Sequence, residues 1–291
     1  MRYPAQVFLI LASQAYERYS FYAVSTILFM YLTKMYHMDE DDATAVYHTF
    51  MVLGFLTAIL GAIVADVFLG RYKTILIMSL IYSIGTIILA VTSLPFLSSS
   101  TSVAGPLVGA MLIAFAAGAM KPCVYAFGKD QFEEADEKNS KHFFSILYFV
   151  MNFSSTITSI VTPILRGSVS CFKNDCYFLA FCVPAILMVF SFTFYLSGSK
   201  RFSKLPPEGN ILISALKAVC FAVKQWLQNI CSGNSKSHLL DWAKGNYEAT
   251  LISDNKAVFR ILFVFLPIPL FWALEGQIES RWNQQGMDMN G

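Results

Sequence analysis

The chain carries ionic and polar side chains inside stretches that are otherwise apolar enough to cross a bilayer. Gln14, Glu17 and Arg18 are spaced i, i+3 and i+4, so one helical face presents all three, with Tyr22 a turn further on. An ion at bilayer depth costs about 2.5–3.5 kcal/mol, so these side chains are expected to face a bundle interior or a water-filled cavity. Charges and phenols there suit the recognition of a small solute with a carboxylate and amide groups. The alternative is an ion pair near the membrane surface, since Glu17 is little more than a turn into the apolar stretch.

Lys121 is a second cation at an apolar position. It follows "GAMLIAFAAGAM" (109–120), whose small residues let helices approach closely. The alternative to a cavity-facing lysine is one that snorkels to the near interface from its place before Pro122. Tyr148 and Asn152 are spaced i and i+4, a pair that a packed interhelical hydrogen bond would explain.

The composition is that of a membrane protein. Of the 291 residues, 56% are hydrophobic and 14% are charged, whereas a soluble domain is about one quarter charged. Taking about 20 residues as the spanning length, we predict seven transmembrane helices: Pro4–Leu32, Val46–Leu69, Thr74–Leu94, Pro106–Phe127, Phe143–Leu165, Tyr177–Leu196 and Val258–Leu274.

The connecting segments suggest an orientation and a division into domains. Lys and Arg are concentrated in every second loop and in the long polar stretch after the sixth helix, which indicates a cytoplasmic N-terminus. Within that stretch, residues 211–230 predict an amphipathic helix that lies in the membrane interface. We therefore expect a six-helix bundle over residues 1–196, a cytoplasmic linker over 197–256, and helix 7 with the start of an outer loop over 257–291.

Several function classes are disfavoured. No basic run interleaves with aromatic residues, so a nucleic-acid site is not expected, and no Cys/His spacing resembles a metal site. No nucleophile–base pair suggests an enzyme, and no organic cofactor is expected. The N-terminus lacks a signal-peptide cleavage site, so the first helix is expected to remain. Cys171 and Cys176 fall in a loop expected outside, where they are a candidate disulfide pair.

The stretch "GAIVADVFLGRYKTI" (61–75) resembles the loop pattern of major facilitator transporters, in which charges hold neighbouring helix ends together. By that pattern Asp66, Gly70 and Arg71 form a cytoplasmic gating motif. The alternative is a helix cap followed by a basic turn.

Longer stretches make the resemblance specific. The chain resembles the proton-coupled oligopeptide transporter family, in particular its animal di- and tripeptide members, through "ERYSFY", "AVYHTF", "KPCVYAFGKDQFEE", "FFSILYFVMNFSS", "HLLDWAKGNYEATLIS" and "PIPLFWALEGQIESRW". This implies an all-α membrane protein, namely the N-terminal six-helix bundle of the major facilitator fold plus helix 7. It implies symport of di- and tripeptides with protons across the plasma membrane, the lipid bilayer being the other partner. The residues that match the family's peptide site are Arg18, Tyr22, Lys121, Tyr148, Asn152 and Trp272, and those that match its proton-coupling residues are Glu17 and His48.

Two departures qualify that expectation. The family pattern in helix 1 is Glu-x-x-Glu-Arg, and Gln14 cannot titrate where the first Glu does, so proton coupling is expected to be weaker or rerouted through Glu17 or His48. The family has twelve helices and this chain carries seven, so we expect it to be inactive alone. The alternatives are a non-transporting isoform that associates with the full-length transporter, and a related facilitator for another small zwitterionic or anionic substrate.

Overall fold

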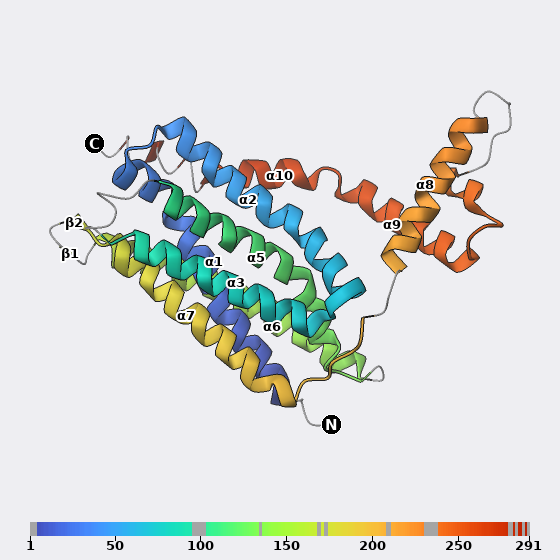
Figure 1. Cartoon of the computed structure of the whole chain (residues 1–291), viewed down its shortest axis with the longest axis horizontal. Helices are drawn as coiled ribbons and strands as arrows, with labels where there is room; N and C mark the ends of the chain where they lie inside the picture. The colour runs from blue at the N-terminus through green and yellow to red at the C-terminus, as the bar shows by residue number, and fades with distance from the viewer. Residues whose placement is uncertain are drawn as a thin grey trace. The chain divides into compact units, whose positions relative to one another are not determined.

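The computed structural model describes residues 5–94, 103–133, 136–167, 170–171, 174–207, 211–229 and 238–278, with positions 282, 285, 286 and 289. It divides into two compact units, one formed by Met1–Pro207 with Glu279–Gly291 and the other by Glu208–Ile278. The first unit contains the helices α1 (Ala5–Tyr36), α2 (Glu40–Ile63), α3 (Arg71–Thr92), α5 (Ala104–Lys129), α6 (Glu137–Gly167) and α7 (Tyr177–Ser197) (Figure 1). The predicted six-helix bundle is therefore confirmed, and the division into three segments stays a prediction.

Helix α1 packs against α6 and α7, and serine side chains join it to α7. The hydroxyls of Ser13 and Ser191 lie 3.0 Å apart, and the Ser191 hydroxyl donates to the Ser13 carbonyl at 2.8 Å. One turn or two further on, the Ser20 hydroxyl donates to the Pro184 carbonyl at 2.8 Å. Because these groups are buried, the bonds fix the register of α1 against α7.

Helix α5 packs against α2 and α3 along a seam of glycines. A Cβ on Gly118 would lie 2.1 Å from the Gly54 carbonyl oxygen, and one on Gly61 would lie 2.1 Å from the Ala119 carbonyl oxygen. Gly85 of α3 and Gly109 of α5 meet in the same way, each with a virtual Cβ 3.0 Å from the other's carbonyl oxygen. The close approach predicted from the small residues before Lys121 is confirmed, because no side chain fits between these backbones.

We expect Gly118→Ala to destabilise the bundle by about 1–3 kcal/mol, because the added methyl group meets backbone and the helices have to move apart. Gly167→Ala is the matched control, since nothing lies within 4 Å of a Cβ at Gly167 near the end of α6. Thermal unfolding of the two purified variants in detergent measures the difference. Equal melting temperatures would contradict the packing described for α2 and α5.

Helix α2 ends in a π-helical turn, Val64–Leu69, that continues it without a break. Gly70 follows with φ of +79°, a left-handed conformation that favours glycine, and α3 begins at Arg71. The sharp change of direction lets Asp66 and Arg71 lie at one end of the bundle, as their predicted motif requires.

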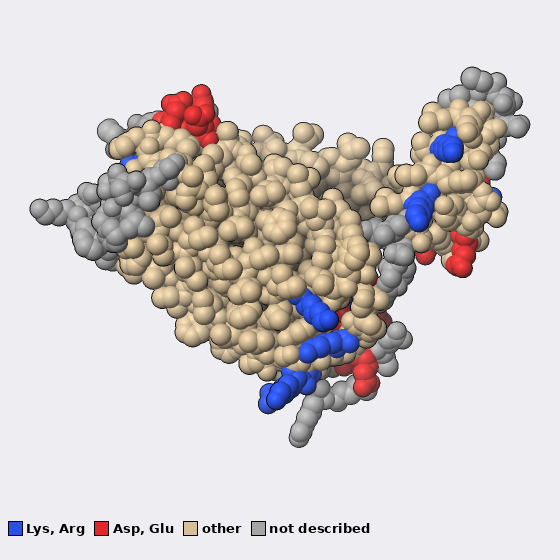
Figure 2. All heavy atoms as spheres, in the orientation of Figure 1, with Lys and Arg blue, Asp and Glu red and all other residues tan. Residues whose placement is uncertain are grey.

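By length and composition, five of the described helices could cross a membrane. They are α2 with its π-helical turn, α3, α5, α6 and α7, and a sixth is counted if α9 and α10 of the second unit, bent by 41° from each other, form one span. Helix α1 is not among them, although its sequence predicts a span. Its polar residues lower its hydropathy, and most of its side chains are buried by the other helices. Figure 2 shows the broad uncharged surface of the bundle between charged ends.

Two short strands precede α7. Strand β1 (Ser170–Cys171) pairs with β2 (Asn174–Asp175) in antiparallel register. Cys176, directly after β2, is disulfide-bonded. The side chain of Cys171 lies outside the described residues, so the pairing of Cys171 with Cys176 stays a prediction.

The second unit contains α8 (Ile211–Asn229), the 3₁₀ helix η3 (Leu239–Ala243), α9 (Ala249–Phe265) and α10 (Ile268–Glu275). Helix α8 confirms the predicted helix over residues 211–230, and its place in the membrane interface stays a prediction. The small core of this unit is formed by Ala222, Leu240, Ala243 and Ile252.

The predicted seventh span, Val258–Leu274, starts later than the helix that carries it. Helix α9 begins at Ala249, because its first turns pack on α8 and η3 instead of lying in an apolar stretch. The buried Asp241 fixes this packing, since its Oδ1 lies 2.7 Å from Nζ of both Lys244 and Lys256. Pro267 then separates α9 from α10.

Candidate functional site

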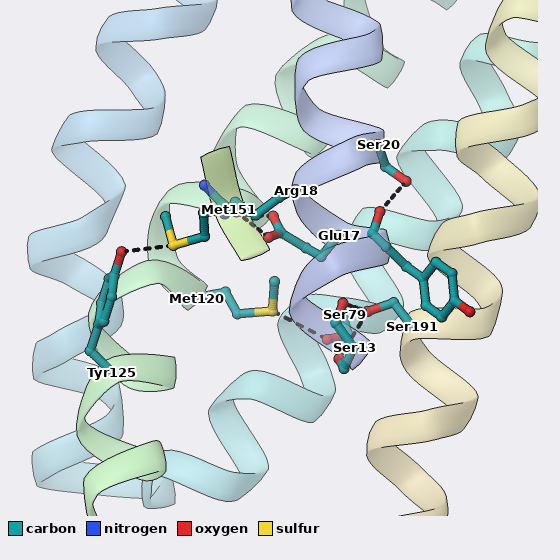
Figure 3. A network of polar contacts seen from close by, with 10 residues as sticks. Ser13, Glu17, Arg18, Ser20, Ser79, Met120, Tyr125, Met151 and Ser191 are labelled. Atoms are coloured by element: carbon teal, nitrogen blue, oxygen red, sulfur yellow. Dashed lines mark hydrogen bonds and ion pairs between the residues drawn. The ribbon is translucent and has the colours of Figure 1, made fainter. Parts of the chain in front are cut away.

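Glu17 and Arg18 form an ion pair in the interior of the bundle (Figure 3). Nη2 of Arg18 donates to one carboxylate oxygen of Glu17 at 2.7 Å, and Nε donates to the other oxygen. Glu17 is 0% exposed and Arg18 is 3% exposed. The neighbouring helices enclose both charges, as expected for side chains that face the bundle interior.

One aromatic ring receives two cations. Phe21, one turn after Arg18, lies 5.6 Å from the Arg18 guanidinium carbon and 5.1 Å from Nζ of Lys121. Nζ of Lys121 also lies 5.4 Å from the ring centroid of Phe55. Glu17 neutralises Arg18, whereas the cation–π contacts of Lys121 hold its charge at the same place without neutralising it, so the arrangement can accept a carboxylate. Lys121 contacts rings of α1 and α2, so it does not adopt a snorkelling conformation.

Two further polar side chains lie around the ion pair. Gln14 is buried on the same face of α1 as Glu17. Tyr82 of α3 is fully buried within electrostatic reach of Glu17 and Arg18, and its hydroxyl has no hydrogen-bond partner among the described residues. Sequence reasoning missed Tyr82, since a tyrosine in an apolar helix looks like any packed aromatic residue.

The remaining sequence-predicted residues of α1 and α2 are Tyr22, close to this centre, and His48, which lies eight residues after the start of α2 at Glu40. The ring of Tyr22 meets Phe21 edge to face at 5.8 Å, which places Tyr22 beside the two cations. His48 is half-buried on α2, and its ring lies 5.7 Å from that of Tyr47.

Tyr148 and Asn152 occupy an exposed face of α6. Tyr148 is 71% exposed, and Nδ2 of Asn152 donates to the Tyr148 carbonyl at 2.8 Å within the same helix. Among the described residues, the hydrogen bond of Asn152 stays within α6 and does not join two helices. Nearby, the hydroxyl of Tyr125 on α5 donates to the sulfur of Met151 on α6 at 3.3 Å (Figure 3).

Trp272 belongs to the second unit. It lies on α10, 47% exposed, with its ring 5.7 Å from that of Phe271. The structure thus gathers Arg18, Tyr22 and Lys121 around Phe21 in the first unit, and it holds Trp272 in the other.

A second cluster of charges forms at the end of the bundle where α2 and α5 end. Nη1 of Arg71 lies 2.7 and 2.9 Å from the two carboxylate oxygens of Asp130, and Nε lies 3.5 Å from Asp66. We call the Arg71–Asp130 pair with Asp66 the latch. Asp130, the residue directly after α5, was missed from the sequence, although a carboxylate at a helix end beside a basic turn was a usable signal.

These features agree with comparisons to known proteins. A family model described as the POT family matches residues 72–291. The chain belongs to this family. POT proteins are peptide transporters, so the chain is a member of a transporter family and not of an enzyme family.

Curated relatives match the chain over nearly its whole length. It is 43% identical over 289 residues to solute carrier family 15 member 2 of Danio rerio and 42% identical over 291 residues to the human member 2, covering 99% of this chain and 40% of each relative. It is 40% identical over 303 residues to solute carrier family 15 member 1 of Oryctolagus cuniculus, covering 43% of that protein. The chain therefore spans about two fifths of the length of the curated relatives it matches.

Solved POT structures share the fold. The POT family transporter PepTSo superposes with a TM-score of 0.78 at 28% identity over 99% of this chain and 64% of that chain. A second structure, of a proton-dependent oligopeptide transporter, gives a TM-score of 0.72 at 30% identity over 97% of this chain and 64% of that one. These similarities confirm the major facilitator type of membrane fold expected from the sequence.

Proposed function

We propose that the chain forms the N-terminal part of a proton-coupled symporter of di- and tripeptides in the plasma membrane. The observation that carries this proposal is the meeting of Arg18 and Lys121 on the ring of Phe21, inside a bundle that belongs to the POT family. A zwitterionic peptide always offers a carboxylate, whatever its side chains, and a pair of fixed cations recognises that group.

The rest of the peptide would be held by phenols and amides. Tyr22 lies beside the two cations, and Tyr148 and Asn152 present polar groups on the exposed face of α6. In a complete transporter the second half of the protein would cover that face, and Trp272 is a further proposed peptide-binding residue. Substrate sites in such folds lie between two repeated halves.

Glu17 is the group that we propose takes up the proton. When Glu17 is ionised it holds Arg18 in a bidentate pair, so the guanidinium is not free for a peptide carboxylate. Protonation removes the negative charge from Glu17, and Arg18 can then turn to the substrate. This exchange of partners couples proton binding to peptide binding, with His48 on α2 as a further proton-coupling residue.

Gln14 should make this coupling less steep than in relatives with a carboxylate there. We expect Gln14→Glu to steepen the dependence of peptide uptake on pH, because it restores a second titratable group on the buried face of α1. Uptake of a labelled dipeptide by the complete transporter between pH 5.5 and 8 measures the change. Gln14→Asn serves as the control that adds no charge, and identical pH profiles for both variants would count against the proposal.

The charge distribution favours a cytoplasmic N-terminus. Exposed acidic residues, Asp39 to Asp42, gather at the start of α2, and basic side chains gather at the opposite end of the bundle (Figure 2). Because loops rich in Lys and Arg stay on the cytoplasmic side, the latch would lie in the cytoplasm.

The direct test is uptake of a labelled dipeptide by the complete transporter in cells that lack other peptide transporters. We expect saturable uptake that is inhibited by unlabelled dipeptides and poorly inhibited by a dipeptide amide, which has no carboxylate. Equal inhibition by the free acid and the amide would reject the role of Arg18 and Lys121. If unlabelled dipeptides failed to inhibit the uptake and a different small anion inhibited it, the substrate would belong to another class.

A further inference from the structure

The segment that follows α7 folds back on the bundle. It comprises Gly198–Pro207, and we call it the strap. After the 3₁₀ turn Gly198–Lys200, the Phe202 ring inserts between rings of three helices and is 7% exposed. Its centroid lies 6.2, 5.3 and 5.3 Å from those of Tyr72 in α3, Phe127 in α5 and Tyr195 in α7.

Gln131 binds the main chain of the strap on both sides of one residue. Its Nε2 donates to the Ser203 carbonyl at 3.1 Å, and the Ser203 N–H donates to its Oε1 at 3.0 Å. Nε2 also donates to the Phe127 carbonyl at 3.1 Å, at the end of α5. Gln131 is only 6% exposed. Its amide makes the same pair of hydrogen bonds to Ser203 that the backbone of a neighbouring β-strand would make. The amide needs both a donor and an acceptor to make these bonds.

The strap also reaches the start of α3. Nζ of Lys204 lies 4.1 Å from the ring centroid of Tyr72 and donates to the Ser199 hydroxyl at 2.9 Å. A Cβ on Gly70 would lie 3.6 Å from the Leu205 carbonyl oxygen. The strap therefore touches the residues on either side of Arg71.

The other half of the latch is equally close in sequence, since Asp130 immediately precedes Gln131. Strap contacts therefore lie next to both residues of the Arg71–Asp130 pair, on Gly70 and Tyr72 either side of Arg71 and on Gln131 after Asp130. Helix α5 ends at Lys129, and the N–H groups of Asp130, Gln131 and Phe132 still donate to the Ala126, Gly128 and Lys129 carbonyls. The Gln131 side chain adds hydrogen bonds that join this end of α5 to the strap.

We propose that Gln131 is a positioning residue of the latch. Its hydrogen bonds tie the strap to the Arg71–Asp130 pair, so that the strap and the latch open and close together. The role of Gln131 in transport rests on the proposed function, whereas the contacts between Gln131 and the strap do not depend on it. Coupling between two sites is reciprocal, so releasing the strap weakens the latch, and breaking the latch frees the strap.

Trypsin tests the coupling on the 291-residue chain in detergent, without any transport. Arg201 and Lys204 are exposed cleavage sites in the strap, and the buried Phe202 protects the bond after Arg201 while the strap is bound. Cleavage of a transiently open segment follows its open population. We expect Gln131→Glu, which keeps the shape but loses the donor to two carbonyls, to speed cleavage after Arg201 by about tenfold. Gln228→Glu, at an exposed position of α8, should leave the rate unchanged.

The link to the latch is read from Asp130→Asn and the double variant. We expect Asp130→Asn alone to speed cleavage after Arg201 severalfold. The double variant, Gln131→Glu with Asp130→Asn, should increase the cleavage rate by less than the product of the two single fold-increases, as coupled residues require. An unchanged rate in Gln131→Glu, or strictly multiplicative rates, would overturn the proposal.

Transport distinguishes this proposal from the function on which its meaning rests. In the complete transporter, Gln131→Glu should lower the maximal uptake rate several-fold while the half-saturating dipeptide concentration stays within about twofold, because the strap lies away from Phe21. A parent protein without dipeptide uptake would reject the proposed function and leave the cleavage result standing. A variant with normal maximal uptake would overturn the role of Gln131 in the latch.

Discussion

Glu17→Ala is expected to lower the stability of the bundle by about 3–5 kcal/mol, because it leaves the Arg18 guanidinium as a buried charge without its carboxylate. Both side chains are almost completely enclosed, so water cannot replace the lost partner. The loss would appear as a large fall in the temperature at which the purified chain unfolds in detergent.

Two controls separate the loss of the ion pair from other effects. The exposed pair Glu137 and Lys141, with an Nζ to Oε1 distance of 2.8 Å, provides the comparison at the surface, and Glu137→Ala should leave the unfolding temperature nearly unchanged. Replacing both buried charges, as Glu17→Leu with Arg18→Met, should recover much of the stability that Glu17→Ala loses. If the double replacement unfolded as early as the single one, an uncompensated charge would not be the cause.

Lys121→Met should weaken dipeptide binding to the complete transporter by at least about 30-fold, since removal of one partner of a buried charge pair costs about 2–5 kcal/mol. In the described part of the chain Lys121 forms no ion pair, and its nearest charged neighbours in electrostatic reach are Arg18 and Glu17. Arg18 is already held by Glu17, which leaves Lys121 as the cation available to an incoming carboxylate.

Lys129→Met is the matched control for this prediction, because Lys129 ends the same helix at an exposed position. Protection of the transporter against thermal unfolding by increasing dipeptide concentrations would give the affinities. Lys121→Met should leave the membrane-inserted amount of protein unchanged, since methionine fits an apolar environment. Unaltered affinity in Lys121→Met would remove Lys121 from the peptide site.

Hydropathy predicted the apolar stretches of the helices well and their polar ends less well. Helix α7 was expected over Tyr177–Leu196 and ends one residue later, at Ser197. Helix α6 begins at Glu137, six residues before the expected Phe143, and α1 continues to Tyr36, four residues beyond Leu32. These extensions carry polar residues, and a hydropathy window detects apolar surroundings and not the continuity of backbone hydrogen bonds.

The candidate site was only partly accessible from the sequence. The charges of Arg18 and Lys121 were evident because ions stand out in apolar helices, yet nothing in the spacing showed that both would meet Phe21. Asp130 and Gln131 were hidden for a related reason, since their partners, Arg71 and Ser203, lie 59 and 72 residues away in the chain. Such pairs are set by how the helices pack.

The glycine seam along α5 has a mechanical consequence. The α2 backbone rests on α5 with no room for a methyl group, and the α3 backbone rests on α5 with little room for one, so sliding or tilting either helix against α5 is opposed by backbone contacts. If the chain takes part in the proposed transport, we expect the three helices to move through its cycle as one stiff body. Elastic strain has to be relieved elsewhere, and the π-helical turn before Gly70 is a natural place for it, because an irregular turn bends at less cost than a regular helix.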